Sequence, residues 1–215
     1  MNHWLCGSYL SDRHGELVDA TVQHIWITAS SVVLGLLVAL PLALLARRYA
    51  RLEAGILGVA TGLYTIPSLA LFPLVVPFTG LTPLTVIVGL ALYSLTILVR
   101  NTLEGLRSVP EEVHESAVGL GYSPTRLLLR VELPLALPVM MAGLRIATVS
   151  TVALTTVGAI VAYGGLGNLL ASGVQENFKA QIFAASVLCV VLALVLDVGL
   201  LAAQRAMTPW TRKRA

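Results

Sequence analysis

Charged residues are scarce in this chain of 215 residues. Only 12% of the residues are charged, against roughly 25% in typical soluble domains. Hydrophobic residues make up 57%, and the mean hydropathy is +0.86. This balance excludes an ordinary soluble domain and predicts an integral membrane protein. The formal net charge of +3 does not indicate nucleic-acid binding, because the basic residues lie beside apolar runs and form no patch with interleaved aromatics.

Lysine is also rare, which excludes an ATP-binding loop of the P-loop kind. Such a loop needs Gly-x4-Gly-Lys-Ser/Thr, in which backbone amides and the lysine hold phosphates. Lys179 is followed by alanine and Lys213 by arginine, so neither fits the pattern. No Ser/His/Asp or Cys/His set is arranged for covalent catalysis. The chain is therefore expected not to be an enzyme, and any energy from ATP must come from a partner.

The few cysteines and histidines do not predict a metal site or a disulfide framework. Cys6 and Cys189 lie far apart, one before the first apolar segment and one inside the last. His114 and Glu115 are adjacent but lack the second pair of ligands that a zinc site needs. We expect no metal and no cofactor bound by this chain.

Apolar segments that are long enough to cross a bilayer fill most of the chain. A spanning helix needs about 20 apolar residues to cross roughly 30 Å of hydrocarbon. Five segments meet this requirement, namely 24–46, 56–79, 83–99, 135–162 and 180–203. The sequence predicts an all-α polytopic bundle of about five transmembrane helices over residues 24–203, although a sixth span stays open.

The basic residues predict the orientation of the bundle, because Lys and Arg favour cytoplasmic loops. Most of them follow the first span, lie between the third and fourth spans, or follow the fifth. This distribution places the 107–134 loop and a basic tail at 204–215 in the cytoplasm, with the N-terminal segment 1–23 outside. Residues 1–23 lack a basic n-region and a cleavage site, so the first span is expected to be retained as an anchor.

The 107–134 loop contains signals for two short helices. Pro110 followed by two glutamates is typical of a helix start, because acids favour the positive end of the helix dipole. We expect this helix to run to about Leu120 and Gly121 to form a left-handed C-cap. Ser123 and Pro124 then suit the N-cap and first position of a second helix that leads to the membrane. An amphipathic helix on the lipid headgroups remains an alternative.

Two features inside the spans are candidates for a transport path. Thr148, Thr151 and Thr155 recur at i, i+3 and i+7, which gathers their hydroxyls on one helical face that should point away from lipid. They could line the path, or they could form hydrogen bonds between packed helices. In the second span, Thr65, Pro67 and Ser68 mark a break, which usually borders a cavity or protein.

Arg145 and Asp197 are the charges placed deepest in the predicted spans. By helical rise, they lie roughly 15 Å and roughly 10 Å from the cytoplasmic ends, so they can pair. A structural ion pair and an arginine extended toward the cytoplasmic vestibule both remain open. Beyond the fourth span, the glycines of 163–168 predict turns, followed by a short outer helix over 169–174.

The stretch from Glu115 to Pro134 reads Glu-Ser-Ala-x3-Gly-x9-Val-x-Leu-Pro. It resembles the "EAA" signature of ABC importer permeases, Glu-Ala-Ala-x3-Gly-x9-Ile-x-Leu-Pro, with Ser116 and Val131 as conservative departures. Further segments resemble the permeases of osmoprotectant importers for glycine betaine, carnitine and choline. They are 65–72, 131–139 continuing through 143–148, and 194–197.

The resemblance implies a methionine-importer-like permease core whose short cytoplasmic helix sits in a groove of the ATP-binding subunit. Carried onto this sequence, the coupling residues are Glu115, Ser116, Ala117, Gly121 and Pro134. Glu115 would pair with a basic residue of that subunit, Ala117 would allow close approach, and Gly121 would make the turn. The neighbouring His114 is expected to be solvated.

The same resemblance implies the partners and the cellular location. They are a dimer of ATP-binding subunits that holds ATP and Mg, a second permease subunit that is a copy or a paralogue, and an extracytoplasmic substrate-binding protein. The location is the prokaryotic plasma membrane, with the C-terminus in the cytoplasm. The cargo would be an osmoprotectant such as glycine betaine, carnitine, choline or proline. The alternatives are a permease for methionine or another amino acid and a secondary transporter outside the ABC class.

Overall fold

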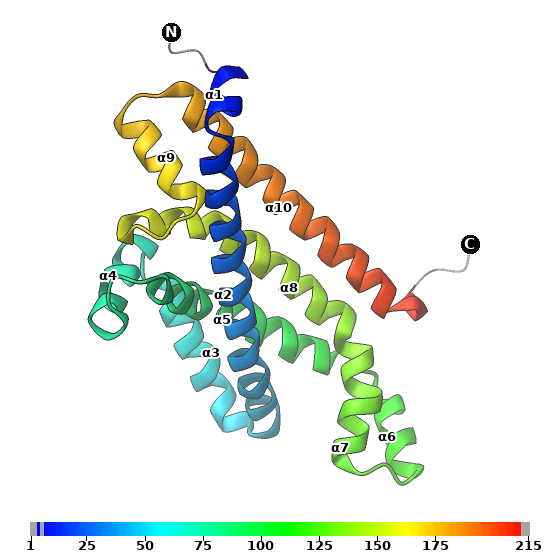
Figure 1. The fold of residues 1–215 in the computed structure, drawn as a ribbon. Helices are drawn as coiled ribbons and strands as arrows, with labels where there is room; N and C mark the ends of the chain where they lie inside the picture. The colour runs from blue at the N-terminus through cyan, green and yellow to red at the C-terminus, as the bar shows by residue number, and fades with distance from the viewer. Residues whose placement is uncertain (1–3, 5–6, 212–215) are drawn as a thin grey trace.

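The computed structural model describes residue 4 and residues 7–211 of the chain, and these form helices and turns without strands. Figure 1 shows their arrangement. The helices are α1 (Gly7–Asp12), α2 (His14–Arg48), α3 (Ala50–Thr65), α4 (Ser68–Thr79), α5 (Pro83–Arg107), α6 (Glu111–Gly119), α7 (Pro124–Leu127), the π-helical turn η1 (Leu128–Glu132), α8 (Leu133–Thr155), the 3₁₀ turn η2 (Thr156–Val161), α9 (Leu166–Gln175), α10 (Lys179–Met207) and the 3₁₀ turn η3 (Pro209–Thr211).

Four helical stretches are long and apolar enough to cross a membrane, and they are formed by α2, by α5, by α7 through η2, and by α10. The pair α3 and α4 passes the same test together but is bent by 105°. If that pair is one broken span, the structure contains the five spans that the sequence predicts. The break at Ile66 and Pro67 lies where the sequence places it.

The first helix differs from the predicted boundary at residue 24. α2 begins at His14 and continues without a break, so the polar residues of 14–23 extend the spanning helix. Hydropathy alone ends a span where polar residues begin, but the backbone bonds of a helix continue through them. At the other end, α10 reaches Met207. The last four residues of the predicted basic tail at 204–215, residues 212–215, lie outside the described residues.

The core of the bundle is α5, which packs against α2, α3, α4 and α8. Small residues allow these helices to approach closely. A Cβ atom on Gly105 would lie 2.9 Å from the carbonyl oxygen of Ala136, and one on Gly143 would lie 2.3 Å from the Cβ of Asn101. Such contacts between α5 and α8 are typical of membrane helix packing, where close backbone approach replaces the hydrophobic drive.

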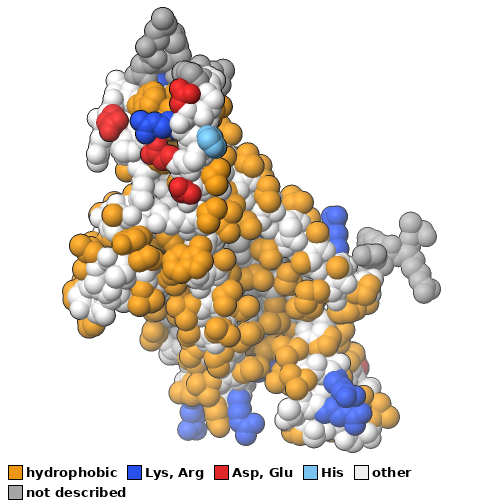
Figure 2. All heavy atoms as spheres, viewed as in Figure 1, with side chains coloured by type: hydrophobic (Ala, Val, Ile, Leu, Met, Phe, Trp, Pro, Cys, Tyr) orange, Lys and Arg blue, Asp and Glu red, His pale blue; other side chains and the backbone are white. Residues whose placement is uncertain are grey.

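The surface divides into an apolar middle and two charged ends. In Figure 2, hydrophobic side chains cover the body, Lys and Arg gather at the end that carries α6, α7 and the start of α3, and Asp and Glu gather beside α1. An apolar band between polar ends fits a bilayer environment. The basic residues that cluster in certain loops of the sequence therefore also gather at one end of the folded chain.

Candidate functional site

The loop between α5 and α8 projects from the end of the bundle (Figure 1). Its first helix, α6, follows Pro110 and ends at Gly119, close to the predicted end. Gly121 then has φ of +78°, as the C-cap prediction requires. The amide of Gly121 donates to the Val118 carbonyl at 2.9 Å, and the amide of Tyr122 donates to that of Ala117 at 3.1 Å. These bonds reverse the chain immediately after α6.

The second half of the loop leads directly into the membrane. The Ser123 side chain accepts a bond from the Arg126 amide at 3.4 Å, and Pro124 is the first residue of α7. α7, η1 and α8 follow without a gap, so Pro134 lies inside a continuous helical path. Proline has no amide hydrogen and its ring crowds the carbonyl four residues earlier, here that of Arg130. The widened turn η1 lies where that crowding must be accommodated.

The predicted coupling residues occupy two sides of α6. Glu115 and Ser116 are exposed, and the Ser116 hydroxyl donates to the Glu112 carbonyl at 2.6 Å. Ala117 is only 6% exposed. Its small side chain packs within the subunit, and its part in the close approach of an ATP-binding subunit stays a prediction.

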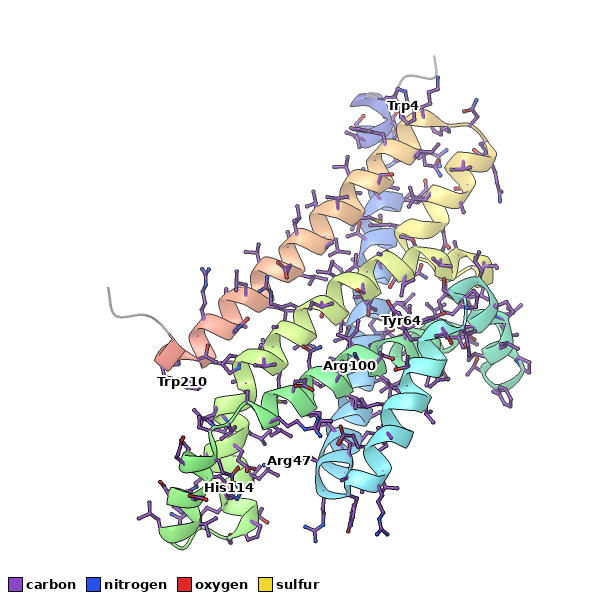
Figure 3. The ribbon with its side chains drawn as sticks, turned by 180° about the vertical axis from the view of Figure 1, so that it is seen from behind. Trp4, Arg47, Tyr64, Arg100, His114 and Trp210 are labelled. Atoms are coloured by element: carbon purple, nitrogen blue, oxygen red, sulfur yellow. The ribbon has the colours of Figure 1, made fainter. Side chains whose placement is uncertain are left out.

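A buried carboxylate that the sequence did not single out lies at the base of this loop. Glu132, the last residue of η1, accepts hydrogen bonds from Arg47 at the end of α2, with distances of 2.6 Å from Nη1 to Oε2 and 2.5 Å from Nη2 to Oε1. His114 Nδ1 lies 3.0 Å from the same Oε1. Figure 3 shows Arg47 and His114 near one another between α2 and the loop.

This cluster corrects the expectation that His114 is a solvated neighbour. His114 is half-buried, and its side chain links α6 to the foot of α8. A signal for Glu132 existed in the sequence, because it is an acid directly before a long apolar run. Its partner Arg47 is 85 residues away, so no local pattern could pair them. Among the described residues, no group of three or more metal-binding side chains is present.

The break in the second span is stabilised by α5. Tyr93 donates its hydroxyl hydrogen to the carbonyl of Ile66, which the break frees from helical bonding. The ring of Tyr93 also packs edge-on against Tyr64, with centroids 5.7 Å apart. Thr65 and Pro67 are exposed on this side of the subunit, where Tyr64 lies (Figure 3). A buried tyrosine on a neighbouring helix thus satisfies the polar group that the proline break exposes.

The threonines of α8 point into the subunit. Thr148, Thr151 and Thr155 are at most 6% exposed, and each hydroxyl donates to the carbonyl four residues earlier in the helix. The hydroxyl of Thr155 also lies 3.0 Å from that of Thr28 on α2. Thr155 therefore bonds to another helix, whereas Thr148 and Thr151 bond within α8, and a role of these threonines in lining the path stays a prediction.

Arg145 on α8 and Asp197 on α10 form an ion pair with two hydrogen bonds. Arg145 Nε lies 2.9 Å from Oδ1 of Asp197, and Nη2 lies 2.8 Å from Oδ2. The side chains are 27% and 30% exposed, so the pair lies at the edge of the bundle rather than in its centre. Its geometry ties the last helix to α8.

Beyond α8, the chain turns through η2 and a glycine-rich segment into α9. The Gly165 amide donates to the Gln23 side chain at 3.1 Å, which pins this turn to α2. The predicted outer helix is present, but it begins at Leu166, three residues before the predicted start. A Cβ on Gly167 would lie 2.2 Å from the carbonyl oxygen of Thr156, so only glycine fits this contact.

The family model and the relatives that this chain resembles point to the same protein family. Residues 31–213 match the model of the family described as "Binding-protein-dependent transport system inner membrane component". The chain is 36% identical over 201 residues to the choline transport system permease protein OpuBB of Bacillus subtilis, covering 94% of this chain and 93% of the relative. It is 37% identical over 206 residues to the osmoprotectant import permease protein OsmW of Salmonella typhimurium, with 94% and 96% covered.

The fold is also similar to a solved structure. A chain of the MetNI methionine ABC transporter, solved in inward-facing conformations, superimposes with a TM-score of 0.83. The match covers 92% of this chain and 98% of that chain at 22% sequence identity. The predicted methionine-importer-like core is therefore confirmed at the level of the fold.

Proposed function

Because the chain belongs to the family of binding-protein-dependent transport system inner membrane components, we propose that it forms the translocation path of an ATP-driven importer for an osmoprotectant. The candidates for the cargo are glycine betaine, carnitine, choline and proline. The observation that carries this proposal is similarity over almost the whole chain to relatives named for choline and osmoprotectant transport. A relative named for glycine betaine, carnitine and choline transport is 34% identical over 209 residues.

The energy for transport comes from a separate dimer of ATP-binding subunits that holds ATP and Mg. α6 is the contact for this dimer, because it projects from the bundle and is exposed along most of its length. Glu115 faces outward there and can pair with a basic residue of the ATP-binding subunit. Gly121 fixes the angle between α6 and α7, and the continuous path from α7 to α8 carries movement into the membrane.

The path itself lies between this chain and a second permease subunit, which is either a copy or a paralogue. The exposed face of α3 supports this arrangement, because a Cβ added to Gly55, Gly58 or Gly62 would meet no atom within 4 Å. Small residues on an open helical face allow another helix to approach closely. The break beside Thr65, Pro67 and Ser68 then borders the path, and the buried threonines of α8 support it from behind.

The chain is a multi-pass membrane protein of the prokaryotic plasma membrane in this proposal. Its loop 107–134 lies in the cytoplasm, which requires the N-terminus to be outside. An extracytoplasmic binding protein delivers the substrate to the end that carries α9. The concentration of Lys and Arg at the α6 end supports this orientation. Cysteine labelling from either side of the membrane measures it directly.

Reconstitution into proteoliposomes with the ATP-binding subunit and the binding protein tests the function. We expect uptake of radiolabelled choline, glycine betaine or carnitine that requires ATP hydrolysis. Uptake of methionine in place of these compounds would favour the amino-acid alternative. Uptake that persists without the ATP-binding subunit would reject an ABC importer in favour of a secondary transporter.

A further inference from the structure

We infer that Glu132 is a positioning residue that locks coupling helix α6 to the foot of α2, so that movement of α6 reaches the first span as well as α8. The inference rests on the proposed function in one respect, namely that α6 receives the movement of the ATP-binding subunits. It assigns the lock to one carboxylate and its two partners, Arg47 and His114.

A side-chain link between α6 and the spans is needed because few side chains of α6 are buried against the rest of the subunit. Within α6, Ala117 is buried, whereas most of the other side chains are exposed or half-buried. Only residues 108–110 separate the end of α5 from the start of α6, and the main contacts of α6 are with α7 and η1. A helix held in this way can swing when a partner pushes it. The backbone path through α7 leads only into α8, so movement of α6 reaches α2 only if a side chain ties the loop to that helix.

Glu132 has the geometry for this task. Its side chain is 4% exposed, and both carboxylate oxygens are used, Oε2 by Arg47 alone and Oε1 by Arg47 and His114 together. The planar guanidinium matches a carboxylate with two parallel bonds, which fixes direction as well as distance. Glu132 also sits immediately before α8. One side chain therefore joins α6, α2 and the foot of α8.

Apolar packing between α2 and the loop does not replace the link that Glu132 makes. A cleft of about 400 Å³ separates the end of α2 from the loop, and its walls include Leu44 on one side and Leu128 on the other. Apolar side chains therefore leave space between the two elements, and Arg47, His114 and Glu132 line the same cleft. Buried ion pairs are weak evidence for stability but can fix one arrangement over others. A role in positioning fits this site better than a role in holding the fold together.

The first test measures substrate taken up per ATP hydrolysed in the reconstituted transporter. We expect Glu132→Gln, which keeps the shape but removes the charge, to lower this ratio about tenfold while ATP hydrolysis continues. Arg47→Gln should act in the same direction. The exchange of Arg47→Glu with Glu132→Arg should restore part of the ratio. The control is Glu16→Gln, which breaks the exposed pair of Arg13 and Glu16 far from the loop and should leave the ratio unchanged.

The second test follows the movement itself and needs no substrate. Hydrogen exchange is measured on the assembled transporter in nanodiscs, with and without ATP. In the wild type, ATP should change the rate of hydrogen exchange both in residues 111–119 and in residues 42–48 at the end of α2. In Glu132→Gln, the response of 111–119 should remain and the response of 42–48 should be lost.

The outcomes separate this inference from the proposed function. A response of residues 42–48 that survives in Glu132→Gln would overturn the inference, even if transport is confirmed. Absence of uptake by the wild type would overturn the proposed function and leave the exchange experiment decisive for the lock. If Glu132→Gln fails to fold, His114→Ala removes only the α6 side of the link, and His114→Asn keeps a nitrogen near the Nδ1 position. Loss of the response in His114→Ala with rescue in His114→Asn would support the lock, and a response retained in His114→Ala would contradict it.

Discussion

Substitutions of Gly121 test whether the backbone geometry of this turn matters for the proposed coupling. Gly121 is exposed, its φ is +78°, and an added Cβ would meet no atom within 4 Å. A side chain therefore has space, and its cost comes from the left-handed backbone alone. That cost is about 1–2 kcal/mol for an ordinary L-residue. It is larger for β-branched valine and smaller for asparagine, which enters this region more readily.

These costs predict an order of effects. An energy of about 2 kcal/mol shifts the balance between the native turn and alternatives by up to about 30-fold. Uptake per ATP hydrolysed should therefore fall little in Gly121→Asn, further in Gly121→Ala and most in Gly121→Val. Gly121→Pro should uncouple fully, because proline cannot adopt this φ and loses the amide bond to the Val118 carbonyl. The assay compares proteoliposomes with equal amounts of inserted protein.

The matched control is Gly119→Ala, two residues earlier. An added Cβ at Gly119 also meets no atom within 4 Å, but the backbone there is not left-handed. Its ratio of uptake to hydrolysis should stay near the wild-type value. The reasoning is refuted if Gly119→Ala is as harmful as Gly121→Ala, or if Gly121→Val supports normal uptake at normal abundance.

Two further predictions concern the spans. Arg145→Asp and Asp197→Arg should each lower uptake because each leaves like charges together, and the double exchange should recover it; absence of recovery would show that the pair is not required. Gly167→Ala places a Cβ 2.2 Å from the Thr156 carbonyl oxygen and should destabilise the subunit by about 1–3 kcal/mol. Thermal unfolding in nanodiscs measures this loss, and Gly199→Ala, where nothing lies within 4 Å, should show none of it.

The sequence predicts features of this molecule that depend on neighbouring residues. Proline and glycine fix local dihedral angles, so the break at Pro67 and the turn at Gly121 were predicted at the correct positions. An apolar run is also a property of neighbouring residues, so the lengths of these runs predicted the spans. The start of α2 at His14 was missed, because hydropathy measures where lipid begins and not where a helix ends.

Contacts between distant residues were harder to predict. Arg145 and Asp197 could be paired because few charges occur inside the spans, so each had few possible partners. Near the membrane surface many charges compete, and nothing local distinguishes Arg47 as the partner of Glu132. The direction of the threonine hydroxyls depends on how α8 is rotated against α2, which a single sequence does not specify.

Glu132 divides the continuous helical path of α7, η1 and α8 into a short cytoplasmic part and a long part inside the membrane. The short part, α7 with η1, is roughly 13 Å long, and α8 beyond it is roughly 35 Å long at a rise of about 1.5 Å per residue. If the path tilts about Glu132, the far end of α8 moves about three times as far as the tip near Gly121, and Arg47 passes the turn of the carboxylate to α2. A displacement of a few ångströms at the cytoplasmic surface then becomes a change large enough to open or close a path for a small solute at the opposite side of the bilayer.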